Sequence, residues 1–193
     1  MMSEVGGTAP TLPHLLRPGL RLVFIGYNPA IYSAAAGHYY ARPGNVFWRQ
    51  LSASGLVARA LGPEDDASLP EEAGIGFTDL CCRATVRASE LRRDEIAEGS
   101  QRLLEELVEH QPLYAVFSGR GIYQLFARRA LGLSAKELAE RDNGAQRDRI
   151  GVTVPYVIPS SSGLASKWHA ERLERLRALA AMLPEPRRFE PGG

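Results

Sequence analysis

Short apolar runs alternate along the chain with stretches in which apolar residues recur at helical spacing. Four runs are rich in strand-forming residues and lead into polar or glycine-containing turns, at 22–25, 74–80, 113–117 and 152–158. Helical spacing predicts four helices, at 45–55, 94–110, 122–131 and 166–182. Strands that alternate with helices predict an α/β fold, a three-layer α/β/α sandwich around a central, mainly parallel four-stranded sheet.

One domain accounts for most of the chain. A length of 193 residues with 45% hydrophobic content suffices for a single core, and we expect the domain to span residues 19–183. Residues 1–18 are expected to form a flexible N-terminal arm whose 13–17 portion can lie against the body, and residues 184–193 a flexible tail. Residues 135–148 mix charges with Asn-Gly, which predicts a surface loop or a short helix and hairpin.

Arginines without acidic neighbours characterise the first third of the chain, although the net charge is only +1. No Asp or Glu occurs from Gly6 to Pro63, whereas five arginines do: Arg17, Arg21, Arg42, Arg49 and Arg59. A phosphate backbone could approach such a stretch without repulsion, but scattered solvated arginines would give the same pattern. The acidic segment 64–72 is expected to face solvent, away from any DNA.

The two cysteines, Cys81 and Cys82, are adjacent. Neighbouring cysteines rarely form a sound disulfide, and two thiols are too few for a four-cysteine cluster or zinc site, so we expect reduced thiols and neither metal nor cofactor. No secretory signal and no apolar run near about 18 residues is present. These features predict a soluble, cytoplasmic protein without a membrane partner.

Polar side chains follow the first two predicted strands where each strand ends. Asn28 comes just after the first, and Thr78 and Asp79 end the second. In open α/β sheets ligands bind at the carboxyl ends of the strands, so Asn28 and Asp79 could reach one crevice. The alternatives are that Asn28 is a turn residue before Pro29, and that Asp79 binds a loop amide or an arginine.

Four segments, at 26–30, 37–48, 76–80 and 159–164, resemble in order and spacing the mismatch-specific uracil-DNA and thymine-DNA glycosylase family. The resemblance spans roughly residues 20–182. It implies a monomeric enzyme that hydrolyses the N-glycosidic bond of uracil, and of related damaged or mismatched pyrimidines, in double-stranded DNA opposite guanine. Such an enzyme flips the base out of the duplex into a pocket.

The resemblance also assigns roles to individual residues. Asn28 matches the residue that positions the hydrolytic water, and Tyr40 matches the aromatic that stacks on the flipped base, although a core aromatic would give the same periodicity. Substrate contacts are implied for Gly26, Tyr27, Ser33 and Ser160. Contacts to DNA are implied for Ser161, Ser162, Gly163, Leu164 and Ser166, with Leu164 entering the space that the base vacates.

The sequence departs from the family pattern at Asp79, where relatives of the best-known bacterial type have lysine. Our hypothesis is that Asp79 assists catalysis beside Asn28, because a carboxylate can hold the attacking water and stabilise a cationic sugar. Ala30 replaces a common glycine. Ser160 and Ser166 stand where some relatives have asparagine and arginine.

Two other functions remain open at this point. A non-catalytic DNA-lesion-binding module of the same fold would show the same motifs. A small-molecule hydrolase or nucleotide-binding enzyme is disfavoured, because no G-x-G-x-x-G, Walker-type or G-x-S-x-G motif occurs. We expect a monofunctional glycosylase, because a lyase needs a nucleophilic amine and the only lysines, Lys136 and Lys167, lie outside the motifs.

Overall fold

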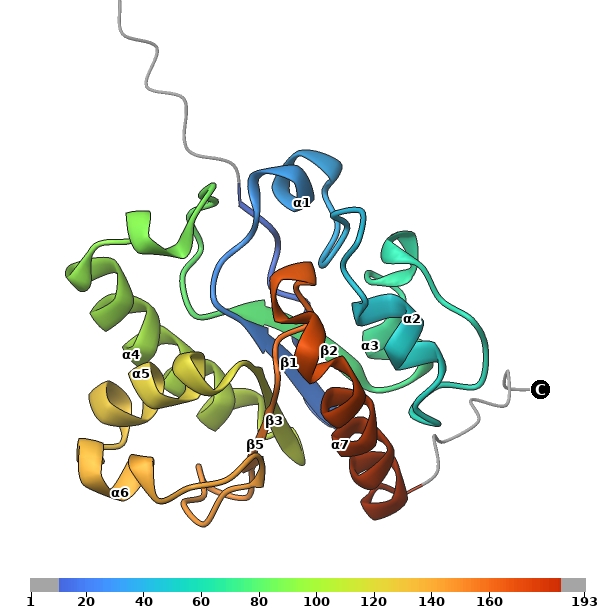
Figure 1. Cartoon of the computed structure of the whole chain (residues 1–193). Coiled ribbons are helices and arrows are strands. Elements are labelled where there is room, and N and C mark those ends of the chain that lie inside the picture. Colours follow the sequence, from blue (N-terminus) through green and yellow to red (C-terminus); the bar gives the residue numbers. More distant parts are fainter. Residues whose placement is uncertain (1–10, 185–193) are drawn as a thin grey trace, which may run out of the picture.

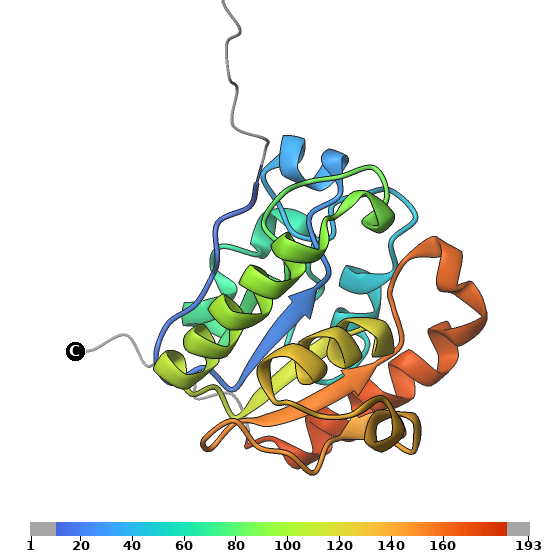
Figure 2. The same cartoon turned by 90° about the vertical axis from the view of Figure 1, so that its left-hand side faces the viewer.

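A computed structural model describes residues 11–184. Its centre is a five-stranded sheet between two layers of helices (Figure 1, Figure 2). The strands are β1 (Leu22–Gly26), β2 (Ile75–Asp79), β3 (Tyr114–Ser118), β4 (Gly144–Ala145) and β5 (Val154–Ile158). The α-helices are α1 (Ile31–Ala36), α2 (Phe47–Ser52), α3 (Leu69–Glu72), α4 (Arg93–His110), α5 (Arg120–Ala130), α6 (Ala135–Ala139) and α7 (His169–Met182). Short 3₁₀ helices span Pro63–Asp65, Ala88–Glu90 and Gly163–Trp168.

The two faces of the sheet support separate hydrophobic cores. In β1, Leu22 and Phe24 point to the core formed with α2, α3 and α7, whereas Val23 and Ile25 point to the core formed with α4, α5 and α6. All five β1 residues are buried. This explains the unbroken apolar run, since a strand covered on both faces has no polar side. The α/β/α layering predicted from the sequence is confirmed.

The sheet has five strands where the sequence predicted four. The strand order is β2-β1-β3-β5-β4, and β4 alone runs antiparallel, pairing Gly144 with Val157 and Ala145 with Tyr156. The other neighbours pair in parallel. A two-residue strand of glycine and alanine has no hydrophobic periodicity, so only the short helix and hairpin given as one alternative for residues 135–148 pointed to it.

Part of the N-terminal segment packs against the domain. Leu12 is buried, and Leu15 exchanges two backbone hydrogen bonds with Phe77 of β2, at 2.8 and 3.1 Å. The 13–17 portion therefore lies against the body, as the sequence suggested, and the packed structure begins before residue 19. The rest of the expected arm, residues 1–10, and residues 185–193 of the expected tail lie outside the described residues.

The last helix differs from its prediction in start and in buried face. A 3₁₀ segment precedes it, and α7 begins at His169. Trp168, an apolar residue of the predicted helix, is 48% exposed, whereas Leu176, Leu179 and the charged Arg172 are buried. Within residues 11–184, no helix is both long and apolar enough to cross a membrane.

Candidate active site

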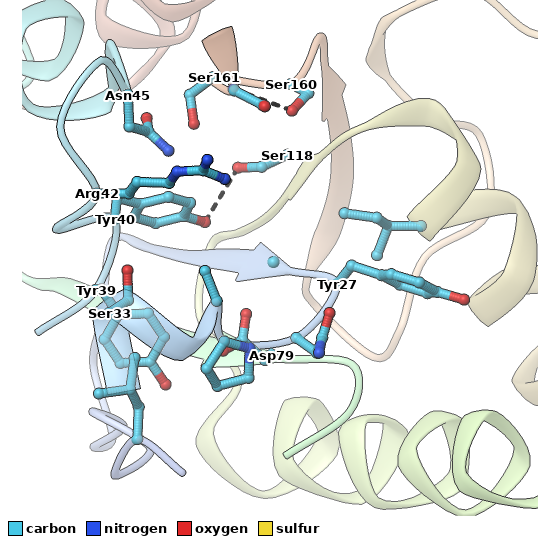
Figure 3. A pocket seen from close by; sticks show the side chains of 17 residues that line it. Tyr27, Ser33, Tyr39, Tyr40, Arg42, Asn45, Asp79, Ser118, Ser160 and Ser161 are labelled. Carbon is cyan, nitrogen blue, oxygen red and sulfur yellow. Dashed lines mark hydrogen bonds between the residues drawn. The ribbon is translucent and has the colours of Figure 1, made fainter. Parts of the chain in front are cut away.

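A pocket of about 210 Å³ opens at the carboxyl ends of the parallel strands (Figure 3). It can hold one single-ring base or several waters, since a water occupies about 30 Å³. Its walls come from the ends of β1, β2 and β3, from α1 and the segment between α1 and α2, and from the loop after β5. The lining residues relevant here are Leu12, Gly26, Tyr27, Asn28, Ser33, Tyr40, Arg42, Asn45, Asp79, Ser118, Ile122, Ser160, Ser161 and Ser162.

Asp79 occupies the space that a side chain at Gly26 would fill. The two residues are partners in the β1–β2 ladder, and a Cβ on residue 26 would lie 2.2 Å from Asp79 Oδ1. Asp79 is only 5% exposed, and among residues 11–184 its carboxyl oxygens have no hydrogen-bond partner. The carboxyl group is therefore buried and lines the pocket, as the strand-end argument predicted.

The environment sets the ionisation of Asp79 near neutral pH. Burial raises the pKa of the carboxyl from 3.8 to about 7, and the positive charges of His14 and Arg102 oppose the rise. A carboxyl with a pKa near 7 can accept a proton from water at neutral pH and still return it. Its position and its pKa together fit a general base.

A charged cluster lies behind the end of β2. Arg102 on α4 donates from Nη2 to the backbone carbonyls of Asp79 and Leu80, at 2.5 and 3.0 Å, and from Nη1 to Glu106 at 2.8 Å. His14 contacts Glu106 at 2.5 Å and the Cys82 thiol at 3.4 Å. Hydrogen bonds to Cys82 and Glu106 raise the pKa of His14 to about 9, so its imidazole is a cation at neutral pH.

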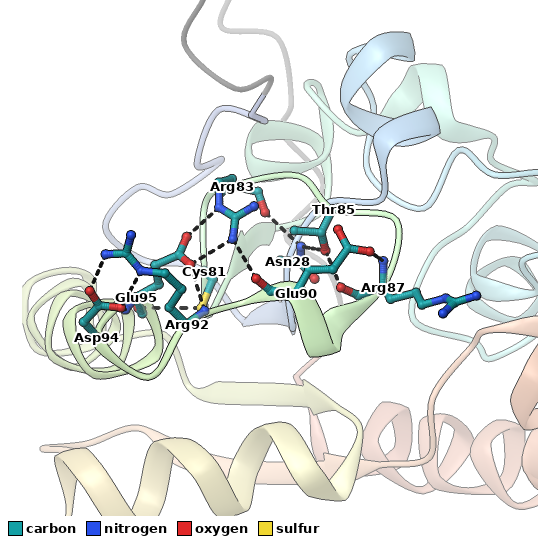
Figure 4. A network of polar contacts seen from close by, with 9 residues as sticks. All are labelled: Asn28, Cys81, Arg83, Thr85, Arg87, Glu90, Arg92, Asp94 and Glu95. Carbon is teal, nitrogen blue, oxygen red and sulfur yellow. Dashed lines mark hydrogen bonds and ion pairs between the residues drawn. The ribbon is translucent and has the colours of Figure 1, made fainter.

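Asn28 uses its amide donors to bind the loop that follows β2 (Figure 4). Its Nδ2 donates to the Arg83 carbonyl and to Thr85 Oγ1, both at 2.8 Å. The Thr85 hydroxyl donates to the Arg87 carbonyl at 2.9 Å, so both partners of Asn28 are acceptors and the nitrogen must face them. The oxygen Oδ1 is left as the acceptor of this side chain, and Asn28 lines the pocket.

The same loop is fastened to the start of α4. Arg83 donates to both carboxyl oxygens of Glu95, at 2.7 and 2.9 Å, and to the Glu90 carbonyl at 2.9 Å. Thr85 also donates its backbone amide to the Pro29 carbonyl at 3.2 Å. These contacts hold the Asn28 side chain in one orientation.

Tyr40 lines the pocket and rests on a second ring. Its ring lies parallel to that of Phe47, with centroids 3.9 Å apart and planes 8° apart, and its hydroxyl donates to Ser118 Oγ at 3.3 Å. The aromatic is therefore backed by the core on one side and accessible from the pocket on the other. This arrangement fits a stacking platform better than a core aromatic.

The backbone around Tyr40 is held in an unusual conformation. Tyr40 has φ of 53°, a left-handed value that non-glycine residues rarely adopt. Three neighbouring contacts fix it: Tyr39 N donates to Asp66 at 2.8 Å, Trp48 Nε1 donates to the Tyr39 carbonyl at 2.9 Å, and Ala41 N donates to Ser33 Oγ at 3.2 Å. The expectation that the whole acidic segment 64–72 faces solvent is wrong at Asp66, which is 2% exposed.

Two predicted substrate contacts have structural partners within the protein. Ser33 is buried and its hydroxyl accepts the Ala41 amide, so it shapes the pocket wall as well as lining it. The Tyr27 side chain extends away from Asp79 and Tyr40 (Figure 3). It packs against the second core, with Ile122 beside it. At Tyr27, the backbone rather than the ring is placed to meet a ligand.

The loop after β5 divides between the pocket and the outer surface. Ser160, Ser161 and Ser162 line the pocket, and Ser161 accepts the Val46 amide at 3.1 Å through its carbonyl. The other predicted DNA contacts, Gly163, Leu164 and Ser166, are exposed outside it. Leu164 is 99% exposed, an apolar side chain that no described residue covers.

Sequence reasoning missed Ser118, Arg42 and Asn45 as pocket residues. Ser118 ends β3 at the same edge as Gly26 and Asp79. It could have been predicted in the same way as Asp79, since polar residues at the carboxyl ends of parallel strands meet at one edge of the sheet. Arg42 and Asn45 belong to the 37–48 segment but had no assigned role. Within the described residues, no group of three or more His, Cys, Asp or Glu side chains is arranged to hold a metal ion.

Comparison with known proteins places this site in a family. The structure is similar to the solution NMR structure of a candidate uracil DNA glycosylase from Methanosarcina acetivorans, with a TM-score of 0.55 and 22% identity, over 88% of this chain and 96% of that one. At this identity the likeness establishes a shared fold. The sequence profile of the Uracil DNA glycosylase superfamily matches residues 13–183. Since that match covers most of the sequence, the chain belongs to the uracil DNA glycosylase superfamily.

Proposed function

We propose that the protein is a monofunctional, mismatch-specific uracil-DNA glycosylase. It hydrolyses the N-glycosidic bond of uracil, and of related damaged or mismatched pyrimidines, in double-stranded DNA opposite guanine. Membership of the superfamily supports DNA glycosylase activity. The observation that supports the mechanism is that Asp79, Asn28 and Tyr40 line one pocket of single-base size.

The reaction separates charge, and the pocket offers a group for each part. The flipped base stacks on Tyr40, and the bond from C1′ to the base breaks with positive charge on the sugar and negative charge on the base. Asp79 stabilises the sugar cation and accepts a proton from the attacking water, whose oxygen bonds to C1′. Asn28 Oδ1 accepts a hydrogen bond from that water, and the base leaves and takes up a proton.

The surface around the pocket suits a distorted duplex. Leu164 fills the space in the stack that the base has left, because an apolar wedge compensates for lost stacking. Ser161, Ser162, Gly163 and Ser166 lie beside the flanking phosphates. Arg42, exposed at the pocket mouth, adds a positive charge on the same side.

The absence of a suitable amine supports hydrolysis without lyase chemistry. A lyase forms a Schiff base through an amine. Within residues 11–184 no lysine lines the pocket, and the Lys167 ammonium lies 5.0 Å from the centre of the Trp168 ring instead. This supports water as the nucleophile in the proposed reaction.

A substrate panel tests the proposal. Duplexes with uracil opposite guanine, uracil opposite adenine and thymine opposite guanine are compared with single-stranded uracil under single-turnover conditions. The wild type should excise uracil opposite guanine fastest, and Asp79→Asn should slow excision by about 10²-fold or more without a matching loss of DNA affinity. Glu109→Gln, which changes an exposed carboxylate on α4, is the matched control. Tight binding of uracil duplex without excision by the wild type would instead establish the non-catalytic lesion binder.

A further inference from the structure

A positive charge is buried beside the aromatic pair that forms the pocket wall. Arg172 on α7 is 0% exposed, and its Nη1 donates to Gln50 Oε1 at 2.7 Å. Its Nε and Nη2 have no hydrogen-bond partner within residues 11–184, and no Asp or Glu of that range forms an ion pair with it. Burial lowers the pKa of Arg172 to about 10, which leaves the guanidinium charged at neutral pH.

The guanidinium lies over Phe47, with Cζ 5.3 Å from the ring centroid. Tyr40 stacks in parallel on the same Phe47 ring. Tyr40 in turn lines the pocket. Arg172, Phe47 and Tyr40 therefore form a chain of contacts that leads from the core to the pocket wall.

We propose that Arg172 is a positioning residue for base excision: acting through the Phe47–Tyr40 pair, its fixed charge stabilises the negative charge that develops on the departing pyrimidine. This inference rests on the proposed function and extends it to a residue outside the pocket. The base is neutral before the bond breaks, so the charge favours the transition state over the bound substrate. Closely packed rings exclude water between the two charges, which keeps their interaction strong.

The size of the effect follows from Coulomb's law. Unit charges about 13 Å apart at an effective dielectric constant of about 20 interact strongly enough to change a rate roughly tenfold. Packing alone would not require a charge here. Burying an arginine without a carboxylate costs stability, and an apolar side chain of similar length would fill the same space.

The first test is Arg172→Met, which removes the charge and keeps most of the volume. Single-turnover excision of uracil should fall about tenfold, while affinity for a duplex containing non-hydrolysable 2′-fluorodeoxyuridine stays within about twofold. Leu176→Ala, which also changes a fully buried side chain of α7, is the packing control. It should lower the thermal unfolding midpoint with little effect on the rate. An unchanged rate for Arg172→Met, or an equal slowing by Leu176→Ala, would overturn the inference.

Arg172→Lys gives a second test that does not depend on the methionine variant folding. A buried lysine loses its proton far more readily than arginine, whereas burial raises the pKa of Tyr40, the titratable group near this site, so that Tyr40 stays neutral over the range tested. The rate of the lysine variant relative to wild type, measured from about pH 5 to pH 9, should be highest at acid pH and fall as pH rises. A ratio that stays near one at every pH would show that the charge is not needed.

The two proposals fail in different ways. If wild-type protein excises no uracil, the proposed function is refuted. If the wild type is active but Arg172→Met slows excision only in proportion to a loss of DNA affinity, only the role of Arg172 is refuted.

Discussion

Asp79 and Gly26 face each other across the β1–β2 ladder so closely that residue 26 has no room for a side chain. A Cβ there would lie 2.2 Å from Asp79 Oδ1 and 3.6 Å from the Tyr40 hydroxyl. Gly26→Ala must therefore displace the carboxyl. We expect uracil excision to fall at least tenfold and stability to fall by about 1–3 kcal/mol, as overpacking usually costs.

A double-mutant cycle checks this relationship. In the Asp79→Ala background the added methyl group meets no carboxyl, so Gly26→Ala should cost much less stability there than in the wild type. Thermal unfolding of the four proteins measures the difference. Equal costs in both backgrounds would show that the two residues do not interact in this way.

The raised pKa of Asp79 should make wild-type stability depend on pH. Between its unfolded value of 3.8 and about 7, the folded protein keeps a proton on Asp79 that the unfolded chain has lost. Stability from this group therefore falls as pH rises through that window. Asp79→Asn removes the dependence, so its stability relative to the wild type should be greater at pH 8 than at pH 4, by at most on the order of 4 kcal/mol. Urea unfolding at both values measures it, and parallel curves for the two proteins would contradict the assignment.

The excision rate should rise as pH increases through about 7, because Asp79 acts as a base when it is ionised. The charges of His14 and Arg102 favour that ionised form. His14→Gln removes one of them, so the rising limb of the profile of single-turnover rate against pH should move to higher pH. An unshifted limb with a uniformly lower rate would point to a structural role for His14.

The pH dependence of folding stability gives an independent check that His14 is charged in the folded protein. Its folded pKa of about 9 exceeds the ordinary 6.5 because of its contacts with Cys82 and Glu106. The stabilisation is fully present below pH 6.5 and is lost as pH rises through about 9. The stability difference between wild type and His14→Gln should therefore shrink across that window.

Replacing Asn28 with aspartate should destabilise the protein, although the two side chains have a similar shape. Its amide donates to two acceptors, the Arg83 carbonyl and Thr85 Oγ1. A carboxylate cannot donate and would face both oxygens, so Asn28→Asp should be less stable than Asn28→Ala by about 1–3 kcal/mol. Both variants should lose excision activity. Thr85→Val, which removes one acceptor and leaves Asn28 in place, should have a smaller effect on the excision rate. If Asn28→Asp unfolds no earlier than Asn28→Ala, the orientation assigned to the Asn28 amide is wrong.

The four parallel strands, and the placing of Asn28 and Asp79 at one edge of the sheet, could be predicted because local patterns determine them. A strand buried on both faces must read as an apolar run, and parallel strands end at a common edge. That reasoning placed Asn28 and Asp79 in one crevice, where the structure puts both. The chemical roles given to them remain predictions.

Other features depend on contacts between distant segments, which no local pattern contains. Asp66 is separated by 27 residues from the Tyr39 amide that it binds, and it reads in sequence as one acid among several. The spacing of apolar residues along α7 does not predict that Arg172 is buried. Arg172 is buried because Gln50 and Phe47 on α2 contact its guanidinium group. Charged residues are normally assigned to the surface, so both were missed.

The segment before β1 has a consequence for how the protein can be shortened. β2 is the outermost strand on its side of the sheet, and Leu15 pairs with Phe77 along its open edge. An uncovered edge strand offers free backbone groups to other molecules and promotes aggregation. Removing residues 1–18 as a dispensable leader would expose that edge and delete His14 as well. Such a truncated protein should precipitate more readily on concentration, whereas one that begins at Thr11 should remain dispersed.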